Sequence, residues 1–181
     1  MKVTPLRMPE VVLIEPRIFS DARGYFLETH HAERYRQAGI DAVFVQDNVA
    51  SSRGGVIRGL HYQHPNEQGK LIIVLDGEIF DVAVDIRRGS PTFGAWVGTA
   101  LAAHQQIYIP PGFAHGYCVT SESALVAYKC TTKYVPADEC TVFFRDPDLG
   151  IAWPVAEPLV SDKDRSAPRL RDIDPARLPV F

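Results

Sequence analysis

Short apolar segments separated by turn residues recur along the whole chain of 181 residues. Valine and isoleucine together number 30 against 12 leucines, and 13 glycines and 14 prolines are spread throughout. β-Branched residues favour strands, and Gly and Pro mark turns. The pattern therefore predicts many short strands joined by tight connections.

Apolar residues form runs, or alternate with polar ones, in each predicted strand. The Asp76-Gly77 pair joins two such segments and is typical of a hairpin, because glycine supplies the positive φ of a type I′ turn. The predicted strands cover residues 11–14, 25–29, 43–48, 56–62, 70–76, 77–86, 96–101, 106–109, 116–119, 124–132 and 140–144.

Helical patterns are few. Residues 31–38 predict a short polar helix ended by Gly39, and residues 174–178 predict another near the C-terminus. Strands do not alternate with helices, and no repeat of about 20–50 residues is present, so the prediction is an all-β jelly-roll barrel or sandwich. The Pro-, Asp- and Arg-rich tail, about residues 155–181, is expected to wrap over this single domain; a flexible end is the alternative.

Composition narrows the classes of function. Nineteen Lys and Arg against 22 Asp and Glu give a formal charge of −3, which excludes a general basic surface for nucleic acid or an anionic membrane. The longest aliphatic run, residues 71–75, is far shorter than the roughly 20 residues of a membrane span. No signal-peptide pattern is seen, and we expect a cytoplasmic protein. Three unclustered cysteines, Cys118, Cys130 and Cys140, are expected to be reduced thiols.

Polar residues that interrupt apolar strands mark the candidate chemistry. Arg58, His61 and Lys70 lie within 13 residues and form a cationic cluster suited to an anion. Arg58 and His61 have opposite parity, so they would point to different faces of a strand unless Gly59 carries a bulge. The alternative is that His61 is a structural residue whose hydrogen bonds are satisfied within the fold.

Three further groups stand out, each with a structural alternative. His115 ends the loop at residues 110–116, where it would reach a cleft or bond the backbone of a turn. Tyr128 interrupts the strand at 124–132, as an active group or as a buried tyrosine. The tail carries a charged patch at residues 161–164, which is either functional or simply solvated.

Eleven segments together resemble one family, the dTDP-4-dehydrorhamnose 3,5-epimerases of the cupin superfamily. Their order and spacing run from about residue 10 to residue 168, which is far more specific than any lone histidine. The segments are DARGYF at 21–26, FVQDN at 44–48, VIRGLH at 56–61, QGKL at 68–71, FDVAVDIR at 80–87, SPTFG at 90–94, PGFAHG at 111–116, YK at 128–129, DP at 146–147, GIAWP at 150–154 and SDKD at 161–164.

The resemblance implies roles for individual residues. His61 would be the general base with Asp164 as its partner, Tyr128 the acid on the opposite face of the sugar, and Lys70 the group that stabilises the enolate. Arg23 and Phe26 would reach the site of a neighbouring subunit, which implies a homodimer. Contacts to the dTDP-sugar are implied for Arg58, His115, Gln46, Asn48, Lys163, Glu28, Glu139 and Tyr134. Of these, Tyr134 matches an aromatic position that stacks on thymine.

The chemistry of such a reaction agrees with these residue types. Removal of a proton α to a ketone needs a base and a cation or donor aimed at the developing enolate oxygen. Epimerisation also returns the proton from the other face, so a base and an acid must flank the ring. The 4-keto group activates both C3 and C5. Neither a redox cofactor nor a metal is expected.

Two departures from the usual pattern concern the nucleotide end: Lys133 precedes Tyr134 where two tyrosines are common, and Cys140 follows Glu139. Epimerisation of C3 or C5 alone, as in relatives that make antibiotic sugars, is the first alternative. A metal-dependent cupin dioxygenase is another, although Gln63 stands at the position of a usual histidine ligand and a neutral amide binds transition metals more weakly. A non-catalytic sugar-binding cupin is the third.

Overall fold

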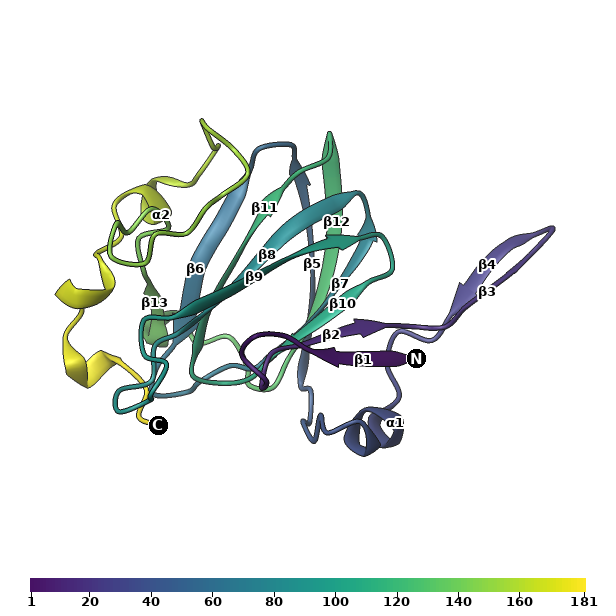
Figure 1. Cartoon of the computed structure of the whole chain (residues 1–181), viewed down its shortest axis with the longest axis horizontal. Coiled ribbons are helices and arrows are strands. Elements are labelled where there is room, and N and C mark those ends of the chain that lie inside the picture. Colours follow the sequence, from purple (N-terminus) through teal and green to yellow (C-terminus); the bar gives the residue numbers. More distant parts are fainter.

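Two antiparallel sheets face each other in the computed structural model, which describes all 181 residues (Figure 1). One sheet has six strands in the order β1-β2-β10-β7-β12-β5, and the other has five in the order β13-β6-β11-β8-β9. Strands that are neighbours in space are often distant in sequence, as in a jelly roll. The prediction of an all-β jelly roll is confirmed.

The strands are short, as predicted. The six-stranded sheet contains β1 (Lys2–Pro5), β2 (Val12–Glu15), β10 (Gln106–Ile109), β7 (Lys70–Asp76), β12 (Ser123–Cys130) and β5 (Gln46–Arg53). The five-stranded sheet contains β13 (Glu139–Thr141), β6 (Ile57–Gln63), β11 (Phe113–Val119), β8 (Glu78–Asp85) and β9 (Trp96–Ala102). A separate hairpin consists of β3 (Ile18–Asp21) and β4 (Gly24–Leu27).

Several predicted boundaries are wrong. The strand predicted at 43–48 begins at Gln46 and runs on to Arg53, because β5 is an edge strand whose residues alternate between outward and inward positions. The strand predicted at 116–119 begins earlier, at Phe113, so His115 lies within β11 and not at the exit of a loop. β1 and β3 were not predicted, because their polar, exposed positions give little apolar signal.

Apolar side chains pack between the two sheets and on the outer face of each sheet. The core between the two sheets includes Val74, Ile79, Leu101 and Val126. A second cluster covers the outer face of the five-stranded sheet, where Leu170 and Leu178 of the tail pack on Val82 and neighbouring residues. The tail carries the short helices α2 (Asp162–Arg165), η2 (Leu170–Asp172) and η3 (Pro175–Arg177) and lies along this side in Figure 1.

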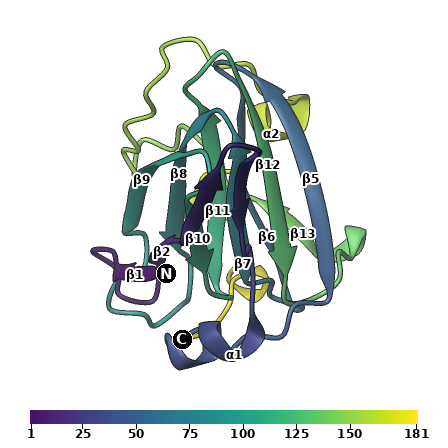
Figure 2. The same ribbon diagram turned by 90° about the vertical axis from the view of Figure 1, so that its right-hand side faces the viewer.

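The helix α1 (Ala32–Gln37) lies at one end of the six-stranded sheet, at the bottom of the view in Figure 2. Its buried Tyr35 packs with Val12, Ile14 and Leu71. The Tyr35 hydroxyl donates to Gln106 Oε1 at 2.6 Å, which satisfies both buried polar groups. Another 3-10 turn, η1 (Pro136–Asp138), precedes β13. No helix is both long and apolar enough to cross a bilayer.

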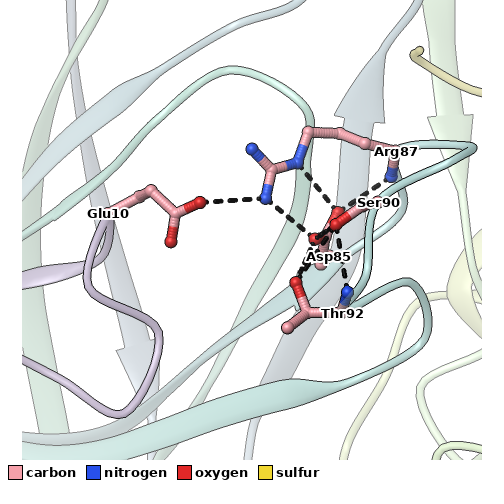
Figure 3. Close-up of polar contacts among 5 residues, drawn as sticks. All are labelled: Glu10, Asp85, Arg87, Ser90 and Thr92. Carbon is pink, nitrogen blue, oxygen red and sulfur yellow. Dashed lines mark hydrogen bonds and ion pairs between the residues drawn. The ribbon is translucent and has the colours of Figure 1, made fainter. Parts of the chain in front are cut away.

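A buried carboxylate at the end of β8 organises the loop that follows it (Figure 3). Asp85 accepts hydrogen bonds from the Arg87 backbone N–H, Nε and Nη2, from Ser90 Oγ and from Thr92 Oγ1. Although burial opposes ionisation, these donors hold the pKa of Asp85 at about 2. Arg87 also pairs with Glu10 at 3.2 Å, so the cluster ties the N-terminal segment to the sandwich.

Candidate active site

Two adjoining cavities of about 210 and 280 Å³ lie between the sheets and share His61, Lys70 and Tyr128 on their walls. His61 belongs to β6 in the five-stranded sheet, whereas Lys70 and Tyr128 belong to β7 and β12 in the six-stranded sheet. Residues that are far apart in sequence therefore face one space from opposite walls. We call the cavity of about 210 Å³ the inner cavity; Arg58 and His115 also line it. The cavity of about 280 Å³ is the outer cavity, and its walls also include Gln46, Asn48, Tyr134 and Glu139.

A β-bulge in β6 places Arg58 and His61 on the same wall. On β11, His115 pairs with His61 and Tyr117 with Arg58, so β6 holds one residue more than its partner between these pairs. Gly59 has φ of 146°, and a Cβ there would lie 2.5 Å from the Cα of Gly116. Arg58 and His61 both line the inner cavity. The prediction that they share a face only if Gly59 carries a bulge is therefore confirmed.

His61 forms a dyad with a buried carboxylate from the tail. Its Nε2 lies 2.7 Å from Oδ1 of Asp164, which is nearly inaccessible to solvent. Asp164 sits in α2, where the Ser161 side chain caps the helix by accepting the Asp164 N–H. Burial opposes ionisation of Asp164, yet its contacts with His61, Ser161 and the Gly59 N–H lower its pKa. An ionised Asp164 holds the imidazole of His61 in one orientation through this hydrogen bond.

A second dyad lies deeper. His115 Nε2 is 2.8 Å from Oδ2 of Asp81 on β8, and both side chains are buried. Burial lowers the pKa of His115, and nearby Lys70 and His61 act in the same direction while Asp81 opposes them. Sequence reasoning missed Asp81; the available signal was an acidic residue alternating with the valines of a buried strand.

Burial shifts the pKa of both Lys70 and Tyr128 towards the uncharged form. Burial lowers the pKa of Lys70, although the Coulombic effects of Cys130, Asp81 and Glu139 oppose this shift. Burial raises the pKa of Tyr128, so the phenol keeps its proton over a wider pH range. A lysine whose charged form burial disfavours and a phenol that keeps its proton therefore line the same cavity as His61.

The outer cavity ends in a polar network around an exposed aromatic ring. Tyr134 Oη donates to Glu139 Oε2 at 3.1 Å, and Lys163 Nζ donates to Glu139 Oε1 at 2.7 Å. Burial opposes ionisation of Glu139, but Lys163 and Tyr134 lower its pKa. The Tyr134 backbone N–H donates to Gln46 Oε1, and Gln46 Nε2 donates to Asn48. The network brings together five of the predicted substrate contacts.

Three predicted site residues lie elsewhere. Arg23 and Phe26 belong to the β3–β4 hairpin, which projects away from the sandwich in Figure 1. Arg23 pairs with Asp21 at 2.6 Å, and Phe26 is 69% exposed. Glu28 follows the hairpin and accepts from Arg34 of α1 at 2.7 Å. Within a single chain none of the three lines the cavities.

Comparison with known proteins identifies the family. Residues 5–172 match the family model of dTDP-4-dehydrorhamnose 3,5-epimerase. A Pseudomonas aeruginosa protein of that name is 49% identical over 178 residues, covering 96% of this chain and 98% of the relative. The chain belongs to the dTDP-4-dehydrorhamnose 3,5-epimerase family.

Two other relatives support the same assignment to the dTDP-4-dehydrorhamnose 3,5-epimerases. A Neisseria gonorrhoeae protein of that name is 48% identical over 91% of this chain, which spans 51% of that longer protein. The crystal structure of a Legionella pneumophila epimerase, in complex with dTDP-4-keto-L-rhamnose, has a TM-score of 0.96 and 49% identity. The alignment covers 99% of this chain and 98% of that one.

The residues that a metal-dependent cupin would use have other partners in this epimerase. Gln63 gives both ends of its amide to backbone groups, and His64 Nδ1 lies 2.9 Å from Glu67 Oε1. No group of three or more His, Cys, Asp or Glu side chains is arranged as a metal site. All three cysteines are free and buried, as predicted for reduced thiols. A metal-free reaction stays a prediction.

Proposed function

We propose that this epimerase acts on dTDP-4-dehydro-6-deoxy-D-glucose at C3 and C5 to give dTDP-4-dehydro-L-rhamnose, without a cofactor. One observation carries the proposal: His61 of one sheet, paired with Asp164 of α2, faces Tyr128 of the other sheet across a cavity that Lys70 also lines. A base and an acid on opposite walls suit proton removal from one face of a sugar and proton return to the other. Binding alone would not need this arrangement.

His61 takes the proton from C3 or C5, and Asp164 stabilises the imidazolium that forms. The electron pair moves into the enolate, whose oxygen Lys70 stabilises by charge. Tyr128 then gives its proton to the opposite face of the carbon. Both carbons lie next to the 4-keto group, so one base serves both when the sugar shifts in the cavity.

The remaining predicted contacts hold the nucleotide. Arg58 and His115 suit the diphosphate and sugar in the inner cavity, where Arg58 supplies a local cation for a dianion in a chain of net charge −3. In the outer cavity Gln46, Asn48 and Glu139 provide polar contacts, and Lys163 joins them through its bond to Glu139. Tyr134 offers an exposed ring for stacking on thymine.

The proposal includes a homodimer in which Arg23 and Phe26 complete the site of the partner chain. The hairpin supports this because Ile18, Phe19, Tyr25 and Phe26 are all exposed on it, and clustered exposed apolar residues mark interaction surfaces. Glu28 adjoins the hairpin and would act across the same interface. In this proposal the chain is one catalytic domain, works in the cytoplasm and serves dTDP-L-rhamnose synthesis, as for cell-surface polysaccharide.

Product analysis in deuterated water tests the reaction. The 4-keto sugar nucleotide is incubated with the enzyme and a 4-keto reductase, and the product is examined by NMR. Deuterium at both C3 and C5 of an L-rhamnose product supports the proposal. Deuterium at one carbon would make the protein a mono-epimerase, and an unlabelled, unchanged sugar would refute epimerisation.

Mixed dimers test the shared site. An Arg23→Ala chain and a His61→Asn chain are each assayed alone and after mixing under conditions that exchange subunits. If Arg23 acts in the partner's site, mixing restores activity, because one site of the mixed dimer has both residues intact. Activity no higher than the sum of the separate variants, with mixed dimers present, would exclude the exchange of Arg23.

A further inference from the structure

The exposed ring of Tyr134 is held by a segment without regular secondary structure. Residues 131–135 link β12 to η1, and Tyr134 is 48% exposed on this segment. An exposed aromatic side chain on a loop binds a ligand well only when the loop is already ordered, because ordering costs free energy at the moment of binding. In this protein a residue of the neighbouring strand β6 holds the segment 131–135 in place.

Gln63, the last residue of β6, brackets Tyr134 with its amide. Its Nε2 donates to the carbonyl oxygen of Lys133 at 3.2 Å, and its Oε1 accepts from the N–H of Val135 at 2.8 Å. The same Nε2 donates to the carbonyl oxygen of Asn66 at 2.9 Å. Gln63 is only 4% exposed, so these bonds are shielded from water.

We infer that Gln63 is a positioning residue for nucleotide binding, acting through Tyr134 and not by contact with the reacting sugar. The inference rests on the proposed function, in which Tyr134 stacks on the base. One side chain fixes the peptide groups on both sides of Tyr134, while Gln46 fixes the Tyr134 N–H itself. The ring is thereby held ready at the mouth of the outer cavity.

The chemistry of the amide explains why glutamine suits this position. Two of its partners are carbonyl oxygens, which need a donor, and the third is an N–H, which needs an acceptor. Gln63→Glu keeps the length and the acceptor but loses both donor bonds. Gln63→Met keeps the length and loses all three. Neither change touches His61, Asp164 or Lys70.

A double-mutant cycle on dTDP binding tests the inference. Calorimetry gives Kd for the wild type, Gln63→Met, Tyr134→Ala and the double variant, each checked for folding by circular dichroism. Gln63→Met is expected to raise the Kd for dTDP about tenfold, which corresponds to the net contribution of about one hydrogen bond. The KM should rise with the Kd. The kcat at saturating substrate should change less than about twofold. In the Tyr134→Ala background Gln63→Met should have no further effect on Kd, because the two residues act as a unit.

Matched variants keep the test decisive. Asn66→Ala removes the bond from Asn66 to Asp138 of η1 and leaves the backbone groups that Gln63 binds in place, so its Kd should stay within about twofold of wild type. If Gln63→Met does not fold, Gln63→Glu replaces it in the cycle, with the same expectation. Equal effects of the Gln63 change with and without Tyr134, or a fall in kcat at unchanged Kd, would overturn the inference alone. A wild type that does not bind dTDP would overturn the proposed function as well.

Discussion

Two aspartates on β8, four residues apart and both fully buried, differ in how completely they are bonded. Asp85 accepts from five donors on Arg87, Ser90 and Thr92, as Figure 3 shows. Asp81 has a single partner, His115, and its Oδ1 has none. A saturated buried carboxylate serves structure, whereas an incompletely bonded one beside a cavity marks a place for ligand chemistry.

Arg87 and Lys70 differ in the same way, since only Arg87 has its hydrogen-bonding groups paired. Arg87 is used fully by Asp85 and Glu10 and lies over the rings of Phe113 and Phe181. Lys70 faces the cavity with only long-range charge partners and a lowered pKa. We therefore expect substitutions in the cavity to reduce activity with little change in stability, and substitutions in the Asp85 cluster to do the reverse.

The largest effect is expected for Asp164→Asn. The amide keeps the shape but loses the charge that stabilises the His61 imidazolium, so kcat should fall about a thousandfold. Steady-state kinetics and thermal unfolding on the same preparation measure both quantities. A kcat within tenfold of wild type would show that the dyad does not act as a unit.

Lys70→Met should reduce kcat about a hundredfold, because the enolate loses its nearby cation. The pH dependence adds a second readout. Burial lowers the pKa of Lys70, so wild-type kcat should fall as the pH rises through a value below the ordinary 10.5. Lys70→Arg, whose charge does not titrate in this range, serves as the control and should lack that alkaline limb if it turns over. An unchanged limb in this variant would assign the titration to another group.

Asp85→Asn should lower the free energy of unfolding by about 2 kcal/mol while kcat of the folded protein stays unchanged. The pKa of Asp85 in the folded state is about 2, below the ordinary 3.8. Its contribution is thus present above about pH 4 and is lost as the pH falls towards 2. Urea unfolding across this range should show a flatter pH dependence in the variant. Loss of activity at full stability would reverse the comparison.

The fold class and most of the residues that line the cavities could be predicted from the sequence, because the apolar alternation and the order of the motifs can be read from it directly. It could not settle on which wall each residue lies. The bulge at Gly59 decides that for Arg58 and His61, and it depends on the close approach of Gly116 on another strand. Asp81 was missed because its pairing with His115 depends on β11 lying beside β8, which the sequence does not show.

Deuterium exchange tests the central claim, that His61 removes the proton and Tyr128 returns it from the opposite wall. The 4-keto sugar nucleotide is incubated in deuterated water with wild type, His61→Asn or Tyr128→Phe, and label at C3 and C5 is followed by NMR. The account predicts no exchange above background with His61→Asn and retained exchange with Tyr128→Phe, which lacks only the acid. Exchange at the wild-type rate in folded His61→Asn would contradict it.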